Sequence, residues 1–172
     1  MFRKRKKNLP ETAASPALIP EIAIPAGLPA QSDAVNGLTL AYVGDAVYEL
    51  MARSYILSCC GGSVRDLHKK TVAFSNAAFQ AYAVEKLLPE LTEAEAGAYK
   101  RGRNAHPGHV PKNKTQAQYH AATGLEALFG WLYLQKDEAR LNALFGSIVN
   151  CSEEYEHEKR RKTEETEKRE KI

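Results

Sequence analysis

An unbroken succession of helical patterns between residues 36 and 150 is the feature that most constrains how this chain folds. Apolar residues recur there at intervals of three and four, and no segment shows the alternation of a half-buried strand. The expected N-caps are Ser63, Ser75, Thr92 and Thr115. The expected helices span 38–58, 64–73, 76–88, 93–103, 116–135 and 138–150. We therefore predict an all-α domain in which the two most apolar helices, the first and the fifth, are central.

Two segments of different composition flank this domain. Residues 1–35 combine a basic cluster at 3–7 with frequent prolines, which block both helix and central strand. We interpret them as a mostly disordered arm, whose basic cluster is either a solvated tail or a weak RNA contact. Residues 151–172 are rich in Glu, Lys and Arg and lack an apolar stripe, so they form either a solvated single helix or frayed coil.

The composition indicates a globular chain without a membrane span. Its 172 residues, 44% hydrophobic and 26% charged, suit one domain with its own core. No uncharged apolar run approaches the roughly 18 residues of a transmembrane helix, and no apolar segment follows the basic N-terminus as in a secretory signal. The three cysteines, two of them adjacent at Cys59 and Cys60, make no disulfide framework and no zinc spacing. We expect a reducing, cytoplasmic compartment.

Two carboxylates lie within the most apolar helical segments. Asp45 follows Gly44 in one of them, and Glu126, the only formally charged residue of its helix, lies between Gly124 and Gly130. A glycine inside a helix costs about 1 kcal/mol relative to alanine, and close backbone approach is the usual reason for one. If the two helices cross at their glycines, Asp45 and Glu126 approach one another where the core is expected.

Such a pair of carboxylates suits a hard divalent cation, Mg²⁺ or Mn²⁺, which prefers oxygen ligands. A cation there would activate water and stabilise phosphoryl oxygens. Burying a carboxylate is costly unless the group is paired, protonated or bound to metal. The residues alone therefore leave two alternatives open, a metal site and ordinary ion pairs. Glu49, one turn after Asp45, is expected to pair with Arg53 rather than to join the site.

Residues 100–114 form a basic segment without acidic side chains, which we expect to be an irregular loop. Lys and Arg in such a loop can follow a phosphate backbone, and polar side chains can reach 2′-hydroxyls. The residues expected to contact RNA are Lys100, Arg101, Arg103, Asn104, Lys112, Asn113 and Lys114. The alternative is a solvated loop. His106 and His109 have no further zinc ligand at suitable spacing, so we interpret them as loop histidines.

Four motifs of this chain resemble those of the ribonuclease III family. Residues 40–49, Leu-Ala-Tyr-Val-Gly-Asp-Ala-Val-Tyr-Glu, resemble the signature of its catalytic domain, and residues 125–130, Leu-Glu-Ala-Leu-Phe-Gly, resemble its second acidic motif. With Arg-Gly-Arg-Asn-Ala at 101–105 and Val-Pro-Lys-Asn at 110–113, the chain is most similar to the short subfamily called Mini-ribonuclease III. The four motifs stand in order at fitting spacing, over about residues 36–148.

This resemblance implies an all-helical ribonuclease III-type endonuclease domain that hydrolyses double-stranded RNA as a homodimer. It implies Asp45 and Glu126 as the catalytic and metal-binding residues, with Mg²⁺ as the cofactor and Mn²⁺ as a substitute. The role implied for the short subfamily is maturation of the 23S ribosomal RNA precursor, helped by a large-subunit ribosomal protein. Larger family members carry acids at the positions of Ala41 and Thr123, whereas the short subfamily resembles this chain there, so we expect activity.

Two further features bear on assembly and function. Tyr42, Val43, Trp131 and Tyr133 cannot all point inward in a domain of this size, so we expect an apolar surface for a second copy of the chain. The replacement of two acids raises an alternative function, a non-catalytic module that binds double-stranded RNA. A third interpretation is a helical interaction protein in which the two acids are ion-paired.

Overall fold

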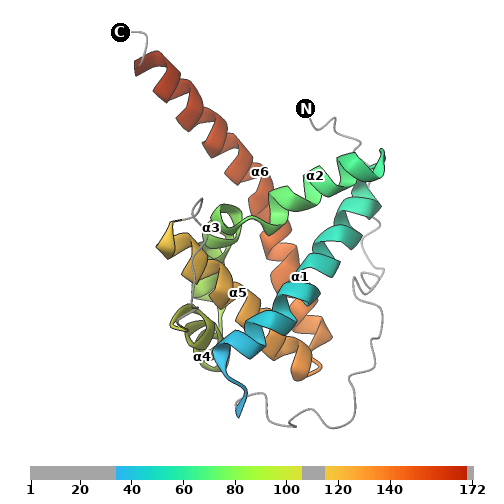
Figure 1. Cartoon of the computed structure of the whole chain (residues 1–172), viewed down its shortest axis with the longest axis vertical. Helices are drawn as coiled ribbons and strands as arrows, with labels where there is room; N and C mark the ends of the chain where they lie inside the picture. Colours follow the sequence, from blue (N-terminus) through green and yellow to red (C-terminus); the bar gives the residue numbers. More distant parts are fainter. Residues whose placement is uncertain (1–33, 106–114, 170–172) are drawn as a thin grey trace.

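The computed structural model describes residues 34–105 and 115–169, and within these ranges the chain is helical with no strand, which confirms the all-α prediction. Figure 1 shows the arrangement of the elements. They are α1 (Gly37–Cys59), α2 (Val64–Ser75), α3 (Ala77–Leu87), a 3₁₀ turn η2 (Leu88–Glu90), α4 (Glu93–Arg103), α5 (Gln116–Leu134) and α6 (Glu138–Arg169). Among the helices of the described ranges, none is long and apolar enough to cross a membrane.

Three of the four predicted N-caps are found in the structure. The structure confirms Ser63, Thr92 and Thr115 as N-caps. The predicted cap of α3 is wrong, because Asn76 rather than Ser75 accepts the backbone N–H of Phe79, at 2.9 Å. The hydroxyl of Ser75 instead donates to the carbonyl of Thr71 at 3.2 Å, so this serine belongs to the last turn of α2.

The two most apolar helices, α1 and α5, are central, as predicted, and their backbones touch at glycines. Helix α1 packs most extensively on α5, which also contacts α3, α4 and α6 (Figure 1). A Cβ atom on Gly44 would overlap the carbonyl oxygen of Glu126, and one on Gly130 would overlap that of Leu40. Only glycine allows so close a crossing, because any other residue would insert its Cβ between the two backbones.

A second close contact joins α4 to α5. A Cβ atom on Gly102 would overlap the side chain of Ala127, and one on Gly124 would overlap the ring of Tyr99. Gly124 therefore serves the contact with α4, whereas Gly130 serves the crossing with α1. The contact holds the basic last turn of α4 close to α5.

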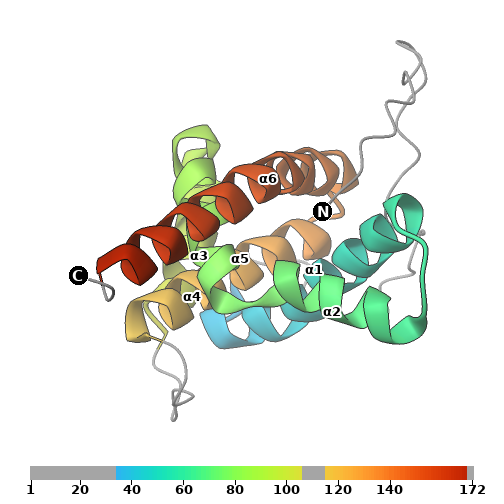
Figure 2. The same cartoon turned by 90° about the horizontal axis from the view of Figure 1, so that it is seen from above.

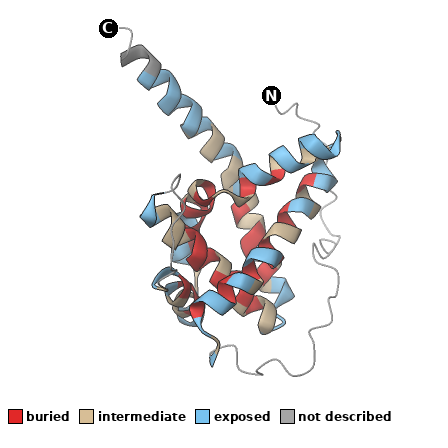
Figure 3. Cartoon of the chain, viewed as in Figure 1, coloured by how far each residue is buried: buried red, intermediate tan, exposed pale blue. Residues whose placement is uncertain are grey.

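The core lies between α1, α3, α5 and the first half of α6, where Figure 3 shows the buried residues. Tyr48 is at its centre and fully buried. Its ring makes edge contacts with Phe129 and Phe145, with ring centroids 5.3 and 5.9 Å away. Its hydroxyl donates to the carbonyl of Phe74 at 3.0 Å, which satisfies the only polar atom of a buried side chain. One residue of α1 thus contacts α2, α5 and α6.

Helix α6 is longer than the sequence predicted. The domain helix was expected to end near Asn150, with residues 151–172 left open between a single helix and frayed coil. The structure shows the helix, because α6 continues without a break to the end of the described residues. Tyr155 anchors this continuation, because its ring packs on Phe79 and Tyr82 of α3 at 5.2 and 5.1 Å, and the hydroxyl of Tyr82 donates to Glu158 at 3.2 Å. Beyond this contact the helix projects from the other elements and is exposed (Figures 1 and 3). From above, α5 lies between α6 and α1 (Figure 2).

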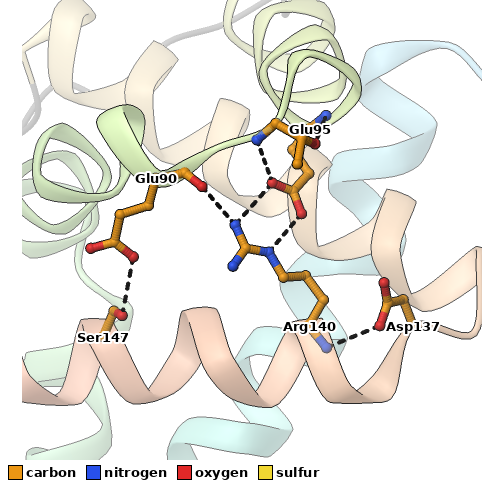
Figure 4. A network of polar contacts seen from close by, with 6 residues as sticks. Glu90, Glu95, Asp137, Arg140 and Ser147 are labelled. Atoms are coloured by element: carbon orange, nitrogen blue, oxygen red, sulfur yellow. Dashed lines mark hydrogen bonds and ion pairs between the residues drawn. The ribbon is translucent and has the colours of Figure 1, made fainter.

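An ion pair fastens the start of α6 to α4 (Figure 4). The guanidinium of Arg140 donates to the two carboxylate oxygens of Glu95 at 2.7 and 3.0 Å and to the carbonyl of Glu90 at 2.8 Å. The side chain of Glu95 is only 5% exposed. Hydrogen bonds from Arg140 hold the pKa of the Glu95 carboxyl below its usual range. The same carboxylate closes the capping box with Thr92, so it stabilises the start of α4 as well.

Candidate active site

The crossing of α1 and α5 positions the two predicted catalytic carboxylates. Gly44 lies against the backbone of Glu126, and Asp45 is the next residue of α1. Asp45 is exposed and Glu126 is half-buried, so the prediction that both lie where the core should be is wrong. The fold covers the face of α1 that meets α5 but leaves its opposite face open, and Tyr42 on that face is 83% exposed. Partial exposure leaves room for a substrate to approach both helices.

The surroundings of Glu126 come from three helices. The side-chain amide of Gln80, on α3, lies with its Nε2 atom 3.5 Å from Oε1 of Glu126. On the α1 side lies Tyr48, whose pKa is raised by burial and further by the negative charge of Glu126. The carboxylate of Glu126 therefore stands at the junction of α1, α3 and α5. Sequence analysis missed Gln80, although a lone glutamine in the apolar start of α3 is the same kind of signal as Glu126 in α5.

The two positions at which the resemblance implies acids in larger family members offer no ligand here, which leaves Asp45 and Glu126 as the candidate carboxylates of this site. Ala41 and Thr123 are both buried, and the hydroxyl of Thr123 donates to the carbonyl of Tyr119 at 3.0 Å. The described residues contain no cluster of three or more His, Cys, Asp or Glu that could hold a metal ion. Two carboxylates still fit Mg²⁺, which usually keeps several waters and binds through one or two carboxylates plus substrate phosphates.

Glu49 takes the structural role expected of it. Its carboxylate oxygen lies 2.6 Å from Nη2 and 3.1 Å from Nε of Arg53, one turn further along α1. The pair lies on the exposed side of the helix. Glu49 is therefore held by an arginine and the prediction of an ion pair is confirmed.

The basic segment is partly helical rather than irregular throughout. Lys100, Arg101 and Arg103 lie in the last turn of α4, where cations favour the C-terminal end of the helix dipole. Lys100, Arg103 and Asn104 are exposed, and Arg101 is half-buried. The other predicted RNA contacts, Lys112, Asn113 and Lys114, lie outside the described residues, as do His106 and His109.

The exposed basic residues of α4 border a groove of about 1000 Å³ between α3, α4 and α5. Its polar lining includes Lys100, Arg103 and Asn104 from α4, Gln116 and His120 from α5, and the acidic Glu85 from α3. The groove thus lies between the two helices that the basic segment connects. Its mixture of cations and amides suits phosphate and sugar oxygens rather than base edges.

Comparison with known proteins identifies the family to which this chain is similar. Residues 38–137 match the family model of the ribonuclease III domain. The Mini-ribonuclease 3 of Clostridium tetani is 40% identical over 121 residues, which cover 70% of this chain and 80% of that protein. The Mini-ribonuclease 3 of Symbiobacterium thermophilum is 44% identical over 116 residues, covering 67% of this chain and 89% of that protein.

A solved structure agrees with these sequence matches. The crystal structure of protein FN1578 from Fusobacterium nucleatum superposes with a TM-score of 0.62 at 32% identity, covering 68% of this chain and 93% of that one. The matched family region spans both α1 and α5, and therefore both carboxylates of the crossing. The chain belongs to the ribonuclease III family, among its short members of the Mini-ribonuclease type.

Proposed function

We propose that this chain, an endoribonuclease by its family, uses Mg²⁺ held by Asp45 and Glu126 to hydrolyse double-stranded RNA. The crossing of α1 and α5 at Gly44 and Gly130 is the observation that carries it, since the crossing puts both carboxylates on adjoining stretches of backbone. Neither is sealed in the core. Mn²⁺ has the same preference for oxygen ligands and would substitute.

The two carboxylates would hold the metal ion from different helices. Bound Mg²⁺ would lower the pKa of a water molecule and neutralise charge that develops on the phosphate. Asp45 is exposed on α1 and therefore accessible to substrate, whereas Glu126 lies at the junction of three helices. Water adds to phosphorus and the 3′ oxygen leaves with a proton, so the products carry 5′-phosphate and 3′-hydroxyl ends. Substrate positioning then falls to other residues of the chain.

The basic segment is proposed to grip the RNA duplex. Lys100, Arg103 and Asn104 stand exposed at the end of α4, and Arg101 beside them contributes positive charge. Lys112, Asn113 and Lys114 follow in the same segment. Contacts from such residues to phosphates position a duplex without reading its sequence.

A homodimer would supply two such sites for the two strands. Leu38, Tyr42 and Ala46 recur every four residues along one face of α1 and are all exposed in the single chain, Leu38 by 42% and Tyr42 by 83%. Asp45 borders this apolar stripe. A two-fold contact through it would bury the stripe and place one Asp45 from each copy beside the interface.

The substrate we propose is the precursor of 23S ribosomal RNA, matured in the cytoplasm with help from a large-subunit ribosomal protein. Similarity to the Mini-ribonuclease proteins supports this proposal. In cells depleted of the protein, 23S RNA with unprocessed ends should accumulate. Unchanged 23S ends would contradict this substrate while leaving the nuclease activity standing.

Ala41 and Thr123, at positions where the resemblance implies acids in larger family members, favour one competing function. That function is a non-catalytic module that binds double-stranded RNA. Ala41 and Thr123 supply no ligand, so the site holds fewer acids than that of larger family members. Incubating the purified chain with duplex RNA in Mg²⁺ or in EDTA separates the two. Cutting in Mg²⁺ but not in EDTA supports the nuclease, whereas a band shift without cutting supports the module.

A further inference from the structure

Gln80 is a buried polar residue whose side chain is directed at the candidate active site. It lies on α3 and is only 2% exposed. Burying an amide is unfavourable unless it forms hydrogen bonds. Among the described residues, the one side-chain hydrogen bond of Gln80 goes to Glu126, with Nε2 3.5 Å from Oε1. The buried amide of Gln80 therefore depends on Glu126 for its hydrogen bond.

The chemistry of the two groups fixes which way the amide faces. An ionised carboxylate can only accept hydrogen bonds, so the NH₂ end of Gln80 must point to Glu126. Tyr48, also close to Glu126, gives its hydroxyl to the carbonyl of Phe74. The amide nitrogen of Gln80 is thus a donor held against one oxygen of the carboxylate.

The backbone that carries Gln80 is firmly held. Asn76 caps the start of α3 by accepting the N–H of Phe79, at 2.9 Å. Phe79 is buried and packs its ring on Phe74 and Tyr155, at 5.2 Å in each case. The neighbouring turn therefore leaves Gln80 little freedom to move away from Glu126.

We propose that Gln80 is a positioning residue, whose amide hydrogen bond to Oε1 of Glu126 fixes the orientation in which this carboxylate would hold a metal ion. This inference rests on the proposed function. Ligating carboxylates are commonly oriented by hydrogen bonds from residues that do not touch the metal, and losing such a partner typically weakens metal binding 10- to 100-fold. Gln80 would therefore determine metal affinity without contacting RNA or metal.

Replacing Gln80 with leucine removes the donor and keeps a side chain of similar size. Mn²⁺ titrated into the RNA-free protein and followed by electron paramagnetic resonance should bind about tenfold more weakly than to the wild type. The Mg²⁺ concentration for half-maximal cleavage should rise by a similar factor, and cleavage at saturating Mg²⁺ should fall much less. Thr71→Val is the matched control, because Thr71 is equally buried and its hydroxyl bonds only within α2, to Leu67. Its Mn²⁺ affinity should equal that of the wild type.

The isosteric variant Gln80→Glu keeps the inference testable if Gln80→Leu fails to fold. It places a second negative charge beside Glu126, so its Tm in EDTA should lie below that of the wild type. A Tm in EDTA equal to that of the wild type would show that residue 80 does not face the carboxylate of Glu126, and would overturn the inference.

The outcomes separate this inference from the function on which it rests. If the wild type neither binds Mn²⁺ nor cuts duplex RNA, the proposed function fails, and the role of Gln80 fails with it. If the wild type does both and Gln80→Leu binds Mn²⁺ with unchanged affinity, only the positioning role is overturned. A loss of stability without a change in metal affinity would overturn the positioning role as well, since a purely structural glutamine would behave in that way.

Discussion

Replacing Gly130 with alanine should destabilise the protein, although alanine is the better helix former. Helix propensity alone would add about 1 kcal/mol of stability. The new Cβ would overlap the carbonyl oxygen of Leu40, and backbone cannot rotate aside as a side chain can. The two central helices must then separate. Overpacking a core typically costs 1–3 kcal/mol and occasionally more, so with a cost at the upper end we expect a net loss of about 2 kcal/mol.

Two other helical glycines provide matched controls. Nothing lies within 4 Å of a Cβ atom placed on Gly97 in α4 or on Gly146 in α6. Gly97→Ala and Gly146→Ala should therefore gain up to about 1 kcal/mol each. Thermal unfolding followed by circular dichroism should show Tm falling by roughly 6–8 °C for Gly130→Ala and rising by about 3–4 °C for the controls. A Gly130→Ala variant as stable as the controls would refute the backbone contact.

The crossing should matter for activity beyond its effect on stability. At a temperature where Gly130→Ala is fully folded, separating the helices shifts Asp45 relative to Glu126. A displacement of about 1 Å can cost on the order of 100-fold in rate. Cleavage by the folded variant should therefore fall at least tenfold, while Gly97→Ala should cut at the wild-type rate.

Three further predictions concern RNA binding, acid stability and assembly. Replacing Lys112 and Lys114 with alanine should weaken duplex binding and lower the slope of log K against log[salt] by roughly 0.9 per lost contact; an unchanged slope would exclude the contacts. Arg140→Met should lower the free energy of unfolding at pH 7 by about 3 kcal/mol, the lower end of the range for a broken buried ion pair, because Glu95 loses its charged partner but keeps the hydrogen bond from Thr92. The pKa of Glu95 is lowered in the folded protein, so the ion pair stabilises the fold at pH values above the unfolded carboxyl pKa of about 4.3. The difference in unfolding free energy between the variant and the wild type should therefore shrink as the pH falls below that value. A difference that does not change with pH would contradict this. Light scattering should give twice the 19.0 kDa chain mass for the wild type and a lower mass for Tyr42→Asp, and a wild-type monomer that cuts both strands would overturn the dimer.

The sequence predicted the fold well because local signals and the global pattern agree. Capping residues such as Ser63 and Thr92 act on their own helix, so their positions can be read from a few neighbouring residues. The sequence left the part of α6 beyond Asn150 open between helix and coil, because the choice depends on contacts with a distant element. Tyr155 looks isolated in a charged segment, but its ring packs on Phe79 and Tyr82 of α3, and Glu154 and Glu158 bind Lys86 and Tyr82.

The sequence predicted which residues form the candidate site, but it did not predict how exposed they are. Asp45 lies in an apolar helix, and from the sequence alone an apolar helix looks buried on every side. The structure covers the face of α1 toward the core but leaves the opposite face, with Tyr42, exposed, so Asp45 is open to solvent. Gln80 was missed because its role depends on a neighbour 46 residues away in the chain. Periodicity within one helix carries no information about such a contact.

Single-turnover cleavage of a duplex RNA by the wild type, Asp45→Asn and Glu126→Gln tests the central claim most directly. Each variant keeps the size of the side chain and removes the charge that a metal ion needs. Both should lose most cleavage at every Mg²⁺ concentration while binding the duplex as tightly as the wild type. Glu126→Gln should unfold at a similar or higher temperature, because a half-buried charge has gone, and Asp45→Asn should unfold at a similar temperature, because Asp45 is exposed. A folded variant that cuts at the wild-type rate would contradict the assignment of that carboxylate to the metal site.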